Sequence, residues 1–381
     1  YMFFRDIEGN KSVKQQLLHA VDSNRLGHAI LFAGQEGDAK LQLAIALSAY
    51  LNCSNRHDGD ACGECPSCMQ IKRLAHPELH FVFPFSASLK KKASSKDVSS
   101  NDFLDDWRNF VIRTNGMGSL SDWYREIGLA SGQGIISAND CNNVIKELSY
   151  TSYESKYKVV IIWMVEKLFY AAAPKLLKIL EEPPQDSLFI LITENKDAIL
   201  DTILSRSQTL NIPEFTREDV KEILVKKYQV DELEASKIAD MSNGNAAMAL
   251  SIANEPNYTA NLFDEFIQWM RICLQADMLK ILPFVDSFSK NSKEYILFFL
   301  RSSLSLLQQA LFFNQTKVVK ASIADNQKET FAKFAKFVTV DNINIFNESI
   351  NKTIYAIERN GNMALLLTNL TIGLCRAFKI K

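Results

Sequence analysis

The stretch HAILFAGQEGDAKLQ, residues 28–42, decides how the first half of the chain is interpreted. It begins with a continuous apolar run, His28–Ala33, and three more such runs follow at 78–83, 158–163 and 187–193. Continuous rather than alternating runs are typical of strands buried on both faces of a parallel sheet. A helical pattern at 171–182 ends at two prolines and separates the last two runs. We therefore expect an α/β domain with a parallel sheet over residues 1–212.

The second part of this stretch, Gly34–Gln42, stands where a phosphate-binding loop would follow the first strand. Such a P-loop reads G-x-x-x-x-G-K-[ST], because its backbone N–H groups close on the phosphates and its hydroxyl holds Mg²⁺. Gly34 and Lys40 match this pattern, whereas Ala39 replaces the second glycine and Leu41 replaces the hydroxyl. The loop is thus a degenerate P-loop, and we expect Lys40 to be a solvated surface lysine rather than a phosphate ligand.

Strand-like runs stop at Pro213, and helical patterns continue to the end of the chain. Thr216 with Asp219 indicates a helix start, and Asn243-Gly244 is typical of a left-handed helix end. We expect a helical lid over 213–256 and a C-terminal helical domain over 257–381.

Residues of about 86–134 fit neither pattern. They contain the basic run Lys90–Lys96 and four aromatic residues, Trp107, Phe110, Trp123 and Tyr124. We interpret them as a surface insertion anchored by the aromatic residues. The alternative is an insertion that binds DNA or a partner.

Composition limits the classes of function. The 381 residues carry 43 Lys and Arg against 44 Asp and Glu, a formal net charge of −1. Because sequence-independent DNA binding depends on neutralised phosphates, a protein that coats nucleic acid by itself is disfavoured. No apolar run reaches the roughly 18 residues of a membrane span, and the first residues do not resemble a signal peptide. We expect a cytoplasmic protein with no membrane partner.

Four of the seven cysteines form the pattern Cys53-x8-Cys62-x2-Cys65-x2-Cys68. Thiolates at such short spacings, with glycines and a proline for tight turns, suit tetrahedral Zn²⁺. Four thiolates leave no open position for water, so the predicted site is structural. His57 replacing one cysteine, or a redox role for Cys62 and Cys65, are the alternatives. The remaining cysteines, Cys141, Cys273 and Cys375, are isolated in the sequence, and we expect them to be small buried residues.

Several stretches in order resemble a known family. They are FRDIEGN at 4–10, HAILFAG at 28–34, the four-cysteine module, HPELH at 76–80, AAAPKLLKILEEPP at 171–184 and TILSRS at 202–207. In this order they resemble the delta prime family of clamp loader subunits of bacterial DNA polymerase III, which are AAA+ relatives. The resemblance implies an AAA+ sheet domain, a helical lid and a helical collar through which the subunits oligomerise.

The resemblance also implies where an active ATP site would have its other residues. An Asp-Glu pair at the end of a strand would hold Mg²⁺ and orient the attacking water. Those positions here are Trp163 and Met164, and Glu166 lies about 6–7 Å too far along an extended chain to replace them. An arginine of the lid falls at Ala247. With Ala39 and Leu41, four parts of one site differ together, so we expect no ATP hydrolysis.

One motif of the family is retained. Ser205-Arg206-Ser207 resembles the Ser-Arg-Cys motif, whose arginine reaches the ATP site of the adjacent subunit. Its guanidinium keeps its charge and meets phosphate oxygens bidentately. The resemblance therefore implies a non-hydrolysing clamp loader subunit in which Arg206, beside Ser205, acts in trans as an arginine finger. Its partners would be the other loader subunits, with the sliding clamp and primer-template DNA reached through the complex.

Two alternatives belong to other classes. One is an active AAA+ ATPase subunit of the same loader, against which the four changes count. The other is a zinc-dependent DNA-binding module that uses the cysteines and Lys90–Lys96 without any complex. The near-zero net charge counts against this second alternative.

Overall fold

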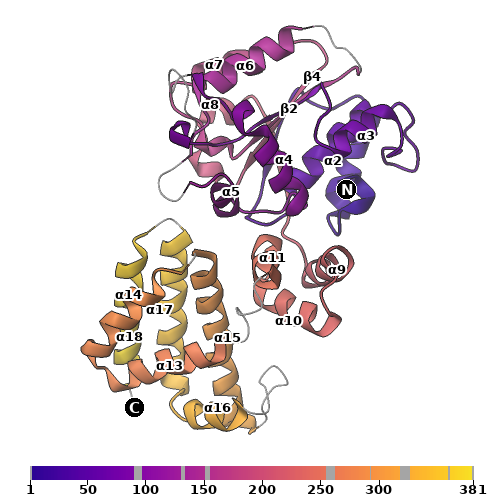
Figure 1. The fold of residues 1–381 in the computed structure, drawn as a ribbon. Helices are drawn as coiled ribbons and strands as arrows, with labels where there is room; N and C mark the ends of the chain where they lie inside the picture. The colour runs from indigo at the N-terminus through magenta and orange to yellow at the C-terminus, as the bar shows by residue number, and fades with distance from the viewer. Residues whose placement is uncertain are drawn as a thin grey trace. The chain divides into compact units, whose positions relative to one another are not determined.

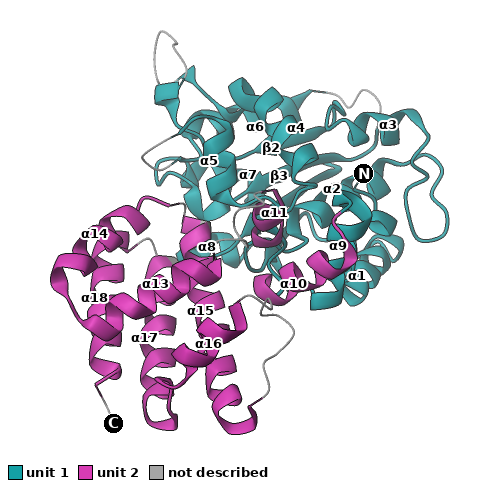
Figure 2. Cartoon of the chain, turned by 60° about the horizontal axis from the view of Figure 1, so that its bottom comes forward, with its two compact units in different colours: residues 1–229, 243–247 teal, residues 230–242, 248–381 magenta. Residues whose placement is uncertain are grey.

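The computed structural model of the chain describes residues 2–89, 97–129, 134–150, 155–254, 262–291, 293–317, 327–358 and 361–379. The chain divides into two compact units, which Figure 2 distinguishes by colour. Unit 1 consists of residues 1–229 and 243–247, and unit 2 consists of residues 230–242 and 248–381. Residues of the expected lid, 213–256, thus occur in both units, and the domain boundaries given above stay predictions.

A five-stranded parallel sheet forms the centre of unit 1. Its order is β2-β3-β4-β1-β5. The strands are β1 (Ala29–Ala33), β2 (Leu79–Val82), β3 (Lys158–Trp163), β4 (Ser187–Thr193) and β5 (Gln208–Asn211). The first four lie where the apolar runs predict them, and β1, β3 and β4 are buried throughout. The edge strand β5 was not predicted, because it has four residues and only one of them is buried.

Unit 1 also contains helices, most of which lie around its sheet (Figure 1). They are α1 (Lys11–Asp22), α2 (Lys40–Asn52), α3 (Pro66–Lys72), α4 (Leu104–Arg113), α5 (Leu120–Glu126), α6 (Ala138–Ser149), α7 (Ala173–Glu181), α8 (Asp201–Leu204) and α9 (Arg217–Tyr228). Short 3₁₀ turns are η1 (Phe4–Asp6), η2 (Ala87–Leu89), η4 (Ser100–Phe103), η5 (Val165–Lys167) and η6 (Lys196–Ala198). The apolar sides of α6 and α7 pack on one face of the sheet, through residues such as Val144, Leu176 and Leu180.

The described part of the insertion is anchored through its aromatic residues. Trp107 and Trp123 are completely buried. The ring of Trp107 stacks on Phe83, which directly follows β2, with centroids 4.3 Å apart. Trp163, at the end of β3, lies 5.0 Å from Trp107 and 5.9 Å from Phe110. The basic run Lys90–Lys96 lies outside the described residues.

Unit 2 is helical (Figure 1). Its helices are α10 (Glu232–Ser242), α13 (Leu262–Gln275), α14 (Met278–Phe288), α15 (Lys293–Thr316), α16 (Lys328–Ala335), α17 (Val340–Glu358) and α18 (Met363–Ala377), and α11 (Ala246–Asn254) begins in unit 1. Within this unit α17 packs on α15 and α18, and α18 also packs on α13 and α14. The fold class that the sequence predicts, a parallel α/β sheet followed by helical regions, is confirmed.

One helix among the described residues satisfies the length and composition of a membrane span. It is the Tyr295–Thr316 part of α15, and half of its most apolar window is buried in the protein. The expectation that no segment would reach this length was wrong, because a helix can include a single arginine and several hydroxyl groups and remain apolar on average. Core helices pass the same test.

Candidate functional site

The loop after β1 contains an internal ion pair at the N-terminus of α2. Oδ1 of Asp38 lies 2.8 Å from Nζ of Lys40 and accepts a hydrogen bond from the backbone N–H of Lys40 at 2.9 Å. Nζ of Lys40 also donates to the carbonyl of Gln35. The first N–H groups of a helix have no partner within the helix and attract anions. The carboxylate of Asp38 therefore lies at the helix end where a P-loop binds a phosphate.

Lys40 is not the solvated surface lysine that the sequence predicts. The side chain of Lys40 is 5% exposed and that of Asp38 is 1% exposed. All of α2 is buried, so its first residue is covered as well. A buried ammonium requires a nearby anion, and Asp38 supplies it. The prediction was wrong because it considered the lysine without the aspartate two residues before it.

Gly34 allows this carboxylate to approach the end of β1. A Cβ atom on Gly34 would lie 2.0 Å from Oδ2 of Asp38, so a larger residue would displace the carboxylate. Burial raises the pKa of Asp38, although the ammonium of Lys40 acts in the opposite direction. The glycine and the lysine that survive from the P-loop pattern thus both contact an internal anion.

The beginning of α11 lies against the same loop. The backbone N–H of Ala246 donates to the carbonyl of Gly37 at 3.1 Å, and Nδ2 of Asn245 donates to Glu36 at 3.3 Å. Gly37 has a φ of +75°, and a Cβ atom there would lie 2.6 Å from the backbone nitrogen of Ala247. Ala247, the expected position of a lid arginine, is therefore in contact with the loop through its backbone, and its side chain carries no charge.

The two positions at which an ATPase would carry Asp and Glu are apolar and buried. Trp163 is 3% exposed and packs into the aromatic cluster described above, and Met164 is 1% exposed. Met164 has a φ of 58°, so the chain turns away sharply after β3. Neither side chain can bind Mg²⁺ or orient water.

Two acidic residues lie close to the Asp38–Lys40 pair. Oε1 of Glu166 accepts a hydrogen bond from the backbone N–H of Glu194, directly after β4, at 3.1 Å. Burial raises the pKa of Glu194 to about 8, and Glu36 and Glu166 add to this increase while Lys40 opposes it. The sequence analysis considered Glu166 but not Glu194, because two segments 28 residues apart meet here only in the folded sheet.

Arg206 lies in the turn between α8 and β5. Its Nη2 is 2.6 Å from Oε1 of Glu181, the last residue of α7. Its Nη1 donates to the carbonyl of Thr202 at 2.9 Å and to the hydroxyl of Ser205 at 3.2 Å. The side chain of Arg206 is 35% exposed. The structure thus brings the two predicted residues, Ser205 and Arg206, into contact and adds Glu181, which the sequence analysis did not single out.

The four predicted cysteines come together in unit 1. The Sγ atoms of Cys53, Cys62, Cys65 and Cys68 all lie within 4.8 Å of one another. Four sulfurs around one tetrahedral Zn²⁺ would be about 3.8 Å apart, since Zn–S bonds are about 2.3 Å long. The distance between Cys62 and Cys68 is 3.9 Å. The donor set therefore fits a tetrahedral metal ion.

The thiols of this cluster are shifted in different directions: burial raises the pKa of Cys53 and of Cys68, away from the thiolate that binds a metal ion. Burial acts to raise the pKa of Cys65, but backbone N–H groups and the hydroxyl of Ser54 lower it to about 6. His57 faces Asp58, with Nδ1 3.2 Å from the carboxylate, and does not belong to the cluster. The buried carboxylate of Asp60 accepts hydrogen bonds from the backbone N–H groups of Phe4 and Arg5. This carboxylate fixes the cysteine loop to the N-terminal segment.

The other three cysteines are buried, as expected. Cys141 lies under α7 in the core of the sheet unit. Within unit 2 the thiol of Cys273 on α13 donates to the carbonyl of Thr371 on α18 at 3.9 Å, and its interaction with the thiol of Cys375 on α18 raises the pKa of Cys273 and lowers that of Cys375 to about 7. The expectation that these three cysteines are buried is therefore confirmed, and the contact within this pair joins two helices that are distant in sequence.

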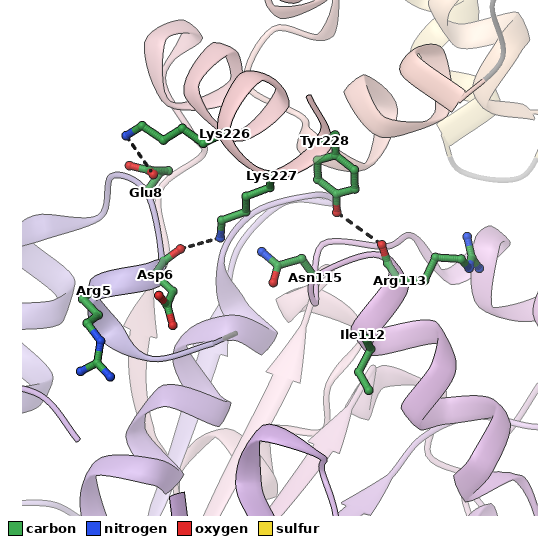
Figure 3. A pocket seen from close by; sticks show the side chains of 9 residues that line it. All are labelled: Arg5, Asp6, Glu8, Ile112, Arg113, Asn115, Lys226, Lys227 and Tyr228. Atoms are coloured by element: carbon green, nitrogen blue, oxygen red, sulfur yellow. Dashed lines mark hydrogen bonds and ion pairs between the residues drawn. The ribbon is translucent and has the colours of Figure 1, made fainter. Parts of the chain in front are cut away.

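A cavity of about 550 Å³ lies within unit 1, between the N-terminal segment, the turn after α4 and the end of α9 (Figure 3). Lys226 forms an ion pair with Glu8 at 3.3 Å, and Lys227 donates to the carbonyl of Asp6. The hydroxyl of Tyr228 donates to the carbonyl of Arg113 at 3.4 Å. These groups hold α9 against the N-terminal segment and the turn after α4. We therefore assign the polar residues around the cavity a structural role and do not treat the cavity as a further candidate site.

The parallel strand order, the loop between β1 and α2 and the helices that follow fit the AAA+ class that the sequence resembles. The family described as "DNA polymerase III, delta subunit" matches residues 9–216. The chain belongs to this family.

Curated relatives agree with this assignment. The chain is 28% identical over 246 residues to a DNA polymerase III subunit delta' of Bacillus subtilis, covering 65% of this chain and 60% of that protein. It is 23% identical to a subunit gamma/tau of Mycoplasma genitalium, covering 95% and 54%. It is 26% identical to a subunit gamma of Buchnera aphidicola, covering 75% and 66%. The chain thus spans between half and two thirds of the length of these relatives.

Two solved structures are similar over part or all of the chain. One is a DNA polymerase III gamma subunit-related protein of Thermotoga maritima, with a TM-score of 0.36, 15% identity and coverage of 96% and 99%. The other is the RuvB Holliday junction branch migration motor of the same organism, with a TM-score of 0.39, 14% identity and coverage of 67% and 63%.

Proposed function

We propose that this chain is a non-hydrolysing subunit of the bacterial DNA polymerase III clamp loader. It would act in the cytoplasm with ATPase subunits and a clamp-opening subunit, and would help load the sliding clamp onto primed DNA. The observation that carries the proposal is the buried pair of Asp38 and Lys40. Phosphoryl transfer requires a cation at the phosphates, an acid for Mg²⁺ and a group that orients water. Here the lysine is bound to an internal carboxylate, and Trp163 and Met164 stand in the acid positions.

In this proposal the chain contributes to ATP hydrolysis through Arg206. The guanidinium would enter the ATP site of a neighbouring subunit and stabilise the negative charge of the transition state. Arginines that act in this way raise the rate by about 10³–10⁵-fold. Support comes from the exposure of Arg206 at the end of a short helix and from Ser205, whose hydroxyl accepts one of its hydrogen bonds.

We also propose that Cys53, Cys62, Cys65 and Cys68 bind one structural Zn²⁺. With four thiolates the ion has no position left for a substrate or water, so it would stabilise the loop between α2 and α3 and would not take part in a reaction. The fit of the four sulfurs to a tetrahedron supports this assignment.

An ATP-hydrolysing loader subunit is the alternative favoured by the relatives named gamma and tau. The isolated chain separates the two. We expect no ATPase activity above buffer and no change in melting temperature with Mg²⁺-ATP, because a ligand stabilises a protein only as far as it binds the native state. Turnover that disappears in Lys40→Ala would contradict the proposal.

The contribution of Arg206 is tested in the reconstituted loader. Arg206→Ala should assemble normally, as checked by size exclusion, but should reduce clamp- and DNA-stimulated ATPase activity and clamp loading. Activity should remain at sites completed by other subunits. Arg206→Lys should restore little, because an ammonium lacks the bidentate fork of guanidinium. A mutant complex that hydrolyses ATP and loads clamps at the wild-type rate would show that Arg206 does not act in trans.

A further inference from the structure

Glu181 holds the guanidinium of Arg206 from a different element of the fold. The shortest contact of Arg206 is the 2.6 Å distance between its Nη2 and Oε1 of Glu181. The other contacts, to Thr202 and Ser205, come from the arginine's own helix end. The orientation of Arg206 relative to the sheet therefore depends on Glu181.

The backbone of Glu181 is well fixed. It is the last residue of α7, and the preceding turn carries Ile179 and Leu180, which are buried in the core against the sheet. Two prolines follow at 183 and 184, and because proline lacks a backbone N–H and does not fit a helix interior, α7 ends here. Glu181 is thus a short acidic side chain on a rigid support, whereas Arg206 is a long side chain in a turn.

The three contacts leave the guanidinium able to bind a phosphate. Arginine has five N–H donors, and the acceptors on Glu181, Thr202 and Ser205 use three of them. Two donors remain on a side chain that is still 35% exposed. An arginine held in this way can meet a phosphate oxygen without first releasing its partners.

The ion pair contributes little to folding, because both side chains are partly exposed and solvent screens their attraction. Its main effect is to restrict the rotamers that the side chain of Arg206 can adopt. A long side chain loses rotamer freedom when it binds, and contacts formed beforehand reduce this loss at the moment of reaction. We therefore expect the ion pair to increase the rate of the chemical step.

We propose that Glu181 is a positioning residue for Arg206, which orients the guanidinium before it enters the ATP site of the neighbouring subunit. This inference rests on the proposed function of Arg206 in trans. It does not require Glu181 to contact the nucleotide.

The test compares loaders reconstituted with wild-type, Glu181→Ala, Glu181→Gln and Arg206→Ala subunits. Because an arginine finger acts in the transition state, Glu181→Ala should lower kcat for stimulated ATP hydrolysis by about threefold or more, toward the Arg206→Ala value, and leave KM for ATP within about twofold. Glu181→Gln should recover most of the rate, since its amide oxygen can accept the same hydrogen bond. Glu182→Ala is the matched control, because it removes the same charge one residue later, and it should behave as wild type.

A second readout uses the isolated chain and needs no partner. Nitrogen NMR of labelled arginine side chains should show slow rotation of the Arg206 guanidinium in the wild type and in Glu181→Gln, and faster rotation in Glu181→Ala. Wild-type kcat and unchanged Arg206 dynamics in Glu181→Ala, together with a defect in Arg206→Ala, would overturn the positioning role and leave the proposed function intact. A wild-type rate for Arg206→Ala would instead overturn the proposed function.

Discussion

At the scale of single residues, the loop after β1 departs from a phosphate-binding loop at Ala39 and Leu41, and it also places a carboxylate where a phosphate would lie. Asp38 lies at the N-terminus of α2 and binds both the backbone N–H and the ammonium of Lys40. The cost of burying the lysine is offset only while this partner is present. Lys40 therefore has a structural partner in this fold that does not require a nucleotide.

Glu194 provides a test of this environment through pH. Its pKa is raised to about 8, so the folded protein binds a proton that the unfolded chain has released above its ordinary pKa of 4.5. The free energy of unfolding should therefore fall as pH rises between these two values. Glu194→Gln should remove this decrease and stabilise the protein at pH 8 by about 2 kcal/mol, less than the full shift implies, because part of the side chain is exposed.

Urea unfolding of the wild type and Glu194→Gln at pH 5 and pH 8 measures the effect. At pH 5 the two proteins should have similar stability, since Glu194 is then protonated in the folded state. A difference between them that is the same at both pH values would show that the amide changes packing and that the carboxyl does not titrate in this range.

For single residues, the sequence is sufficient to predict the cysteine cluster but not the contacts of the loop after β1. The spacing of Cys53, Cys62, Cys65 and Cys68 in one short segment restricts where their sulfurs can lie, and they come together as predicted. The burial of Lys40 and the contact between Glu166 and Glu194 depend on which segments meet at the ends of neighbouring strands. The contact of Arg206 with Glu181 likewise joins two elements, and neither residue alone indicates it.

At the scale of elements, the aromatic cluster attaches the insertion to the sheet. Both tryptophans of the insertion are completely buried, but they differ in one hydrogen bond. Nε1 of Trp123 donates to the carbonyl of Pro84 at 2.7 Å, whereas Nε1 of Trp107 has no partner among the described residues. The two residues therefore form a matched pair for mutagenesis.

Trp123→Phe should destabilise the protein more than Trp107→Phe. Both changes remove part of an indole, but only the first leaves a buried carbonyl without its donor, which costs about 1–3 kcal/mol. Unfolding followed by far-ultraviolet circular dichroism avoids the change in tryptophan fluorescence. Equal losses of stability would show that the bond to Pro84 contributes nothing beyond packing.

Elements with strong local patterns are the ones that the sequence predicts. The buried strands β3 and β4 consist of long apolar runs, and the start of α9 is marked by a capping box of Thr216 and Asp219. The edge strand β5 has only one buried residue, so its sequence lacks the same signal. Its existence depends on pairing with β1, which is a tertiary contact.

At the scale of the whole molecule, the two units have separate cores, and the proposed metal site belongs entirely to one of them. The four cysteines lie in unit 1, and so do the groups that fix their loop, including Asp60 and Arg5. Unit 2 is a helical bundle whose core residues, such as Trp269 and Phe299, come from its own helices. Two compact units of this kind need not unfold in a single step.

Removal of the metal should therefore affect the units unequally. Metal analysis of the reduced protein should first give about one Zn²⁺ per chain. Since metal binding and folding are coupled, chelation should lower the temperature of the calorimetric transition of unit 1 and shift that of unit 2 much less.

Cys62→Ser combined with Cys65→Ser should have the same effect without chelator, and Cys141→Ser, outside the cluster, serves as the control for cysteine substitution. Readdition of Zn²⁺ should restore the transition in the chelated wild type but not in the double variant. Protein that contains no zinc, or a chelator that shifts both transitions equally, would contradict a structural metal site confined to unit 1.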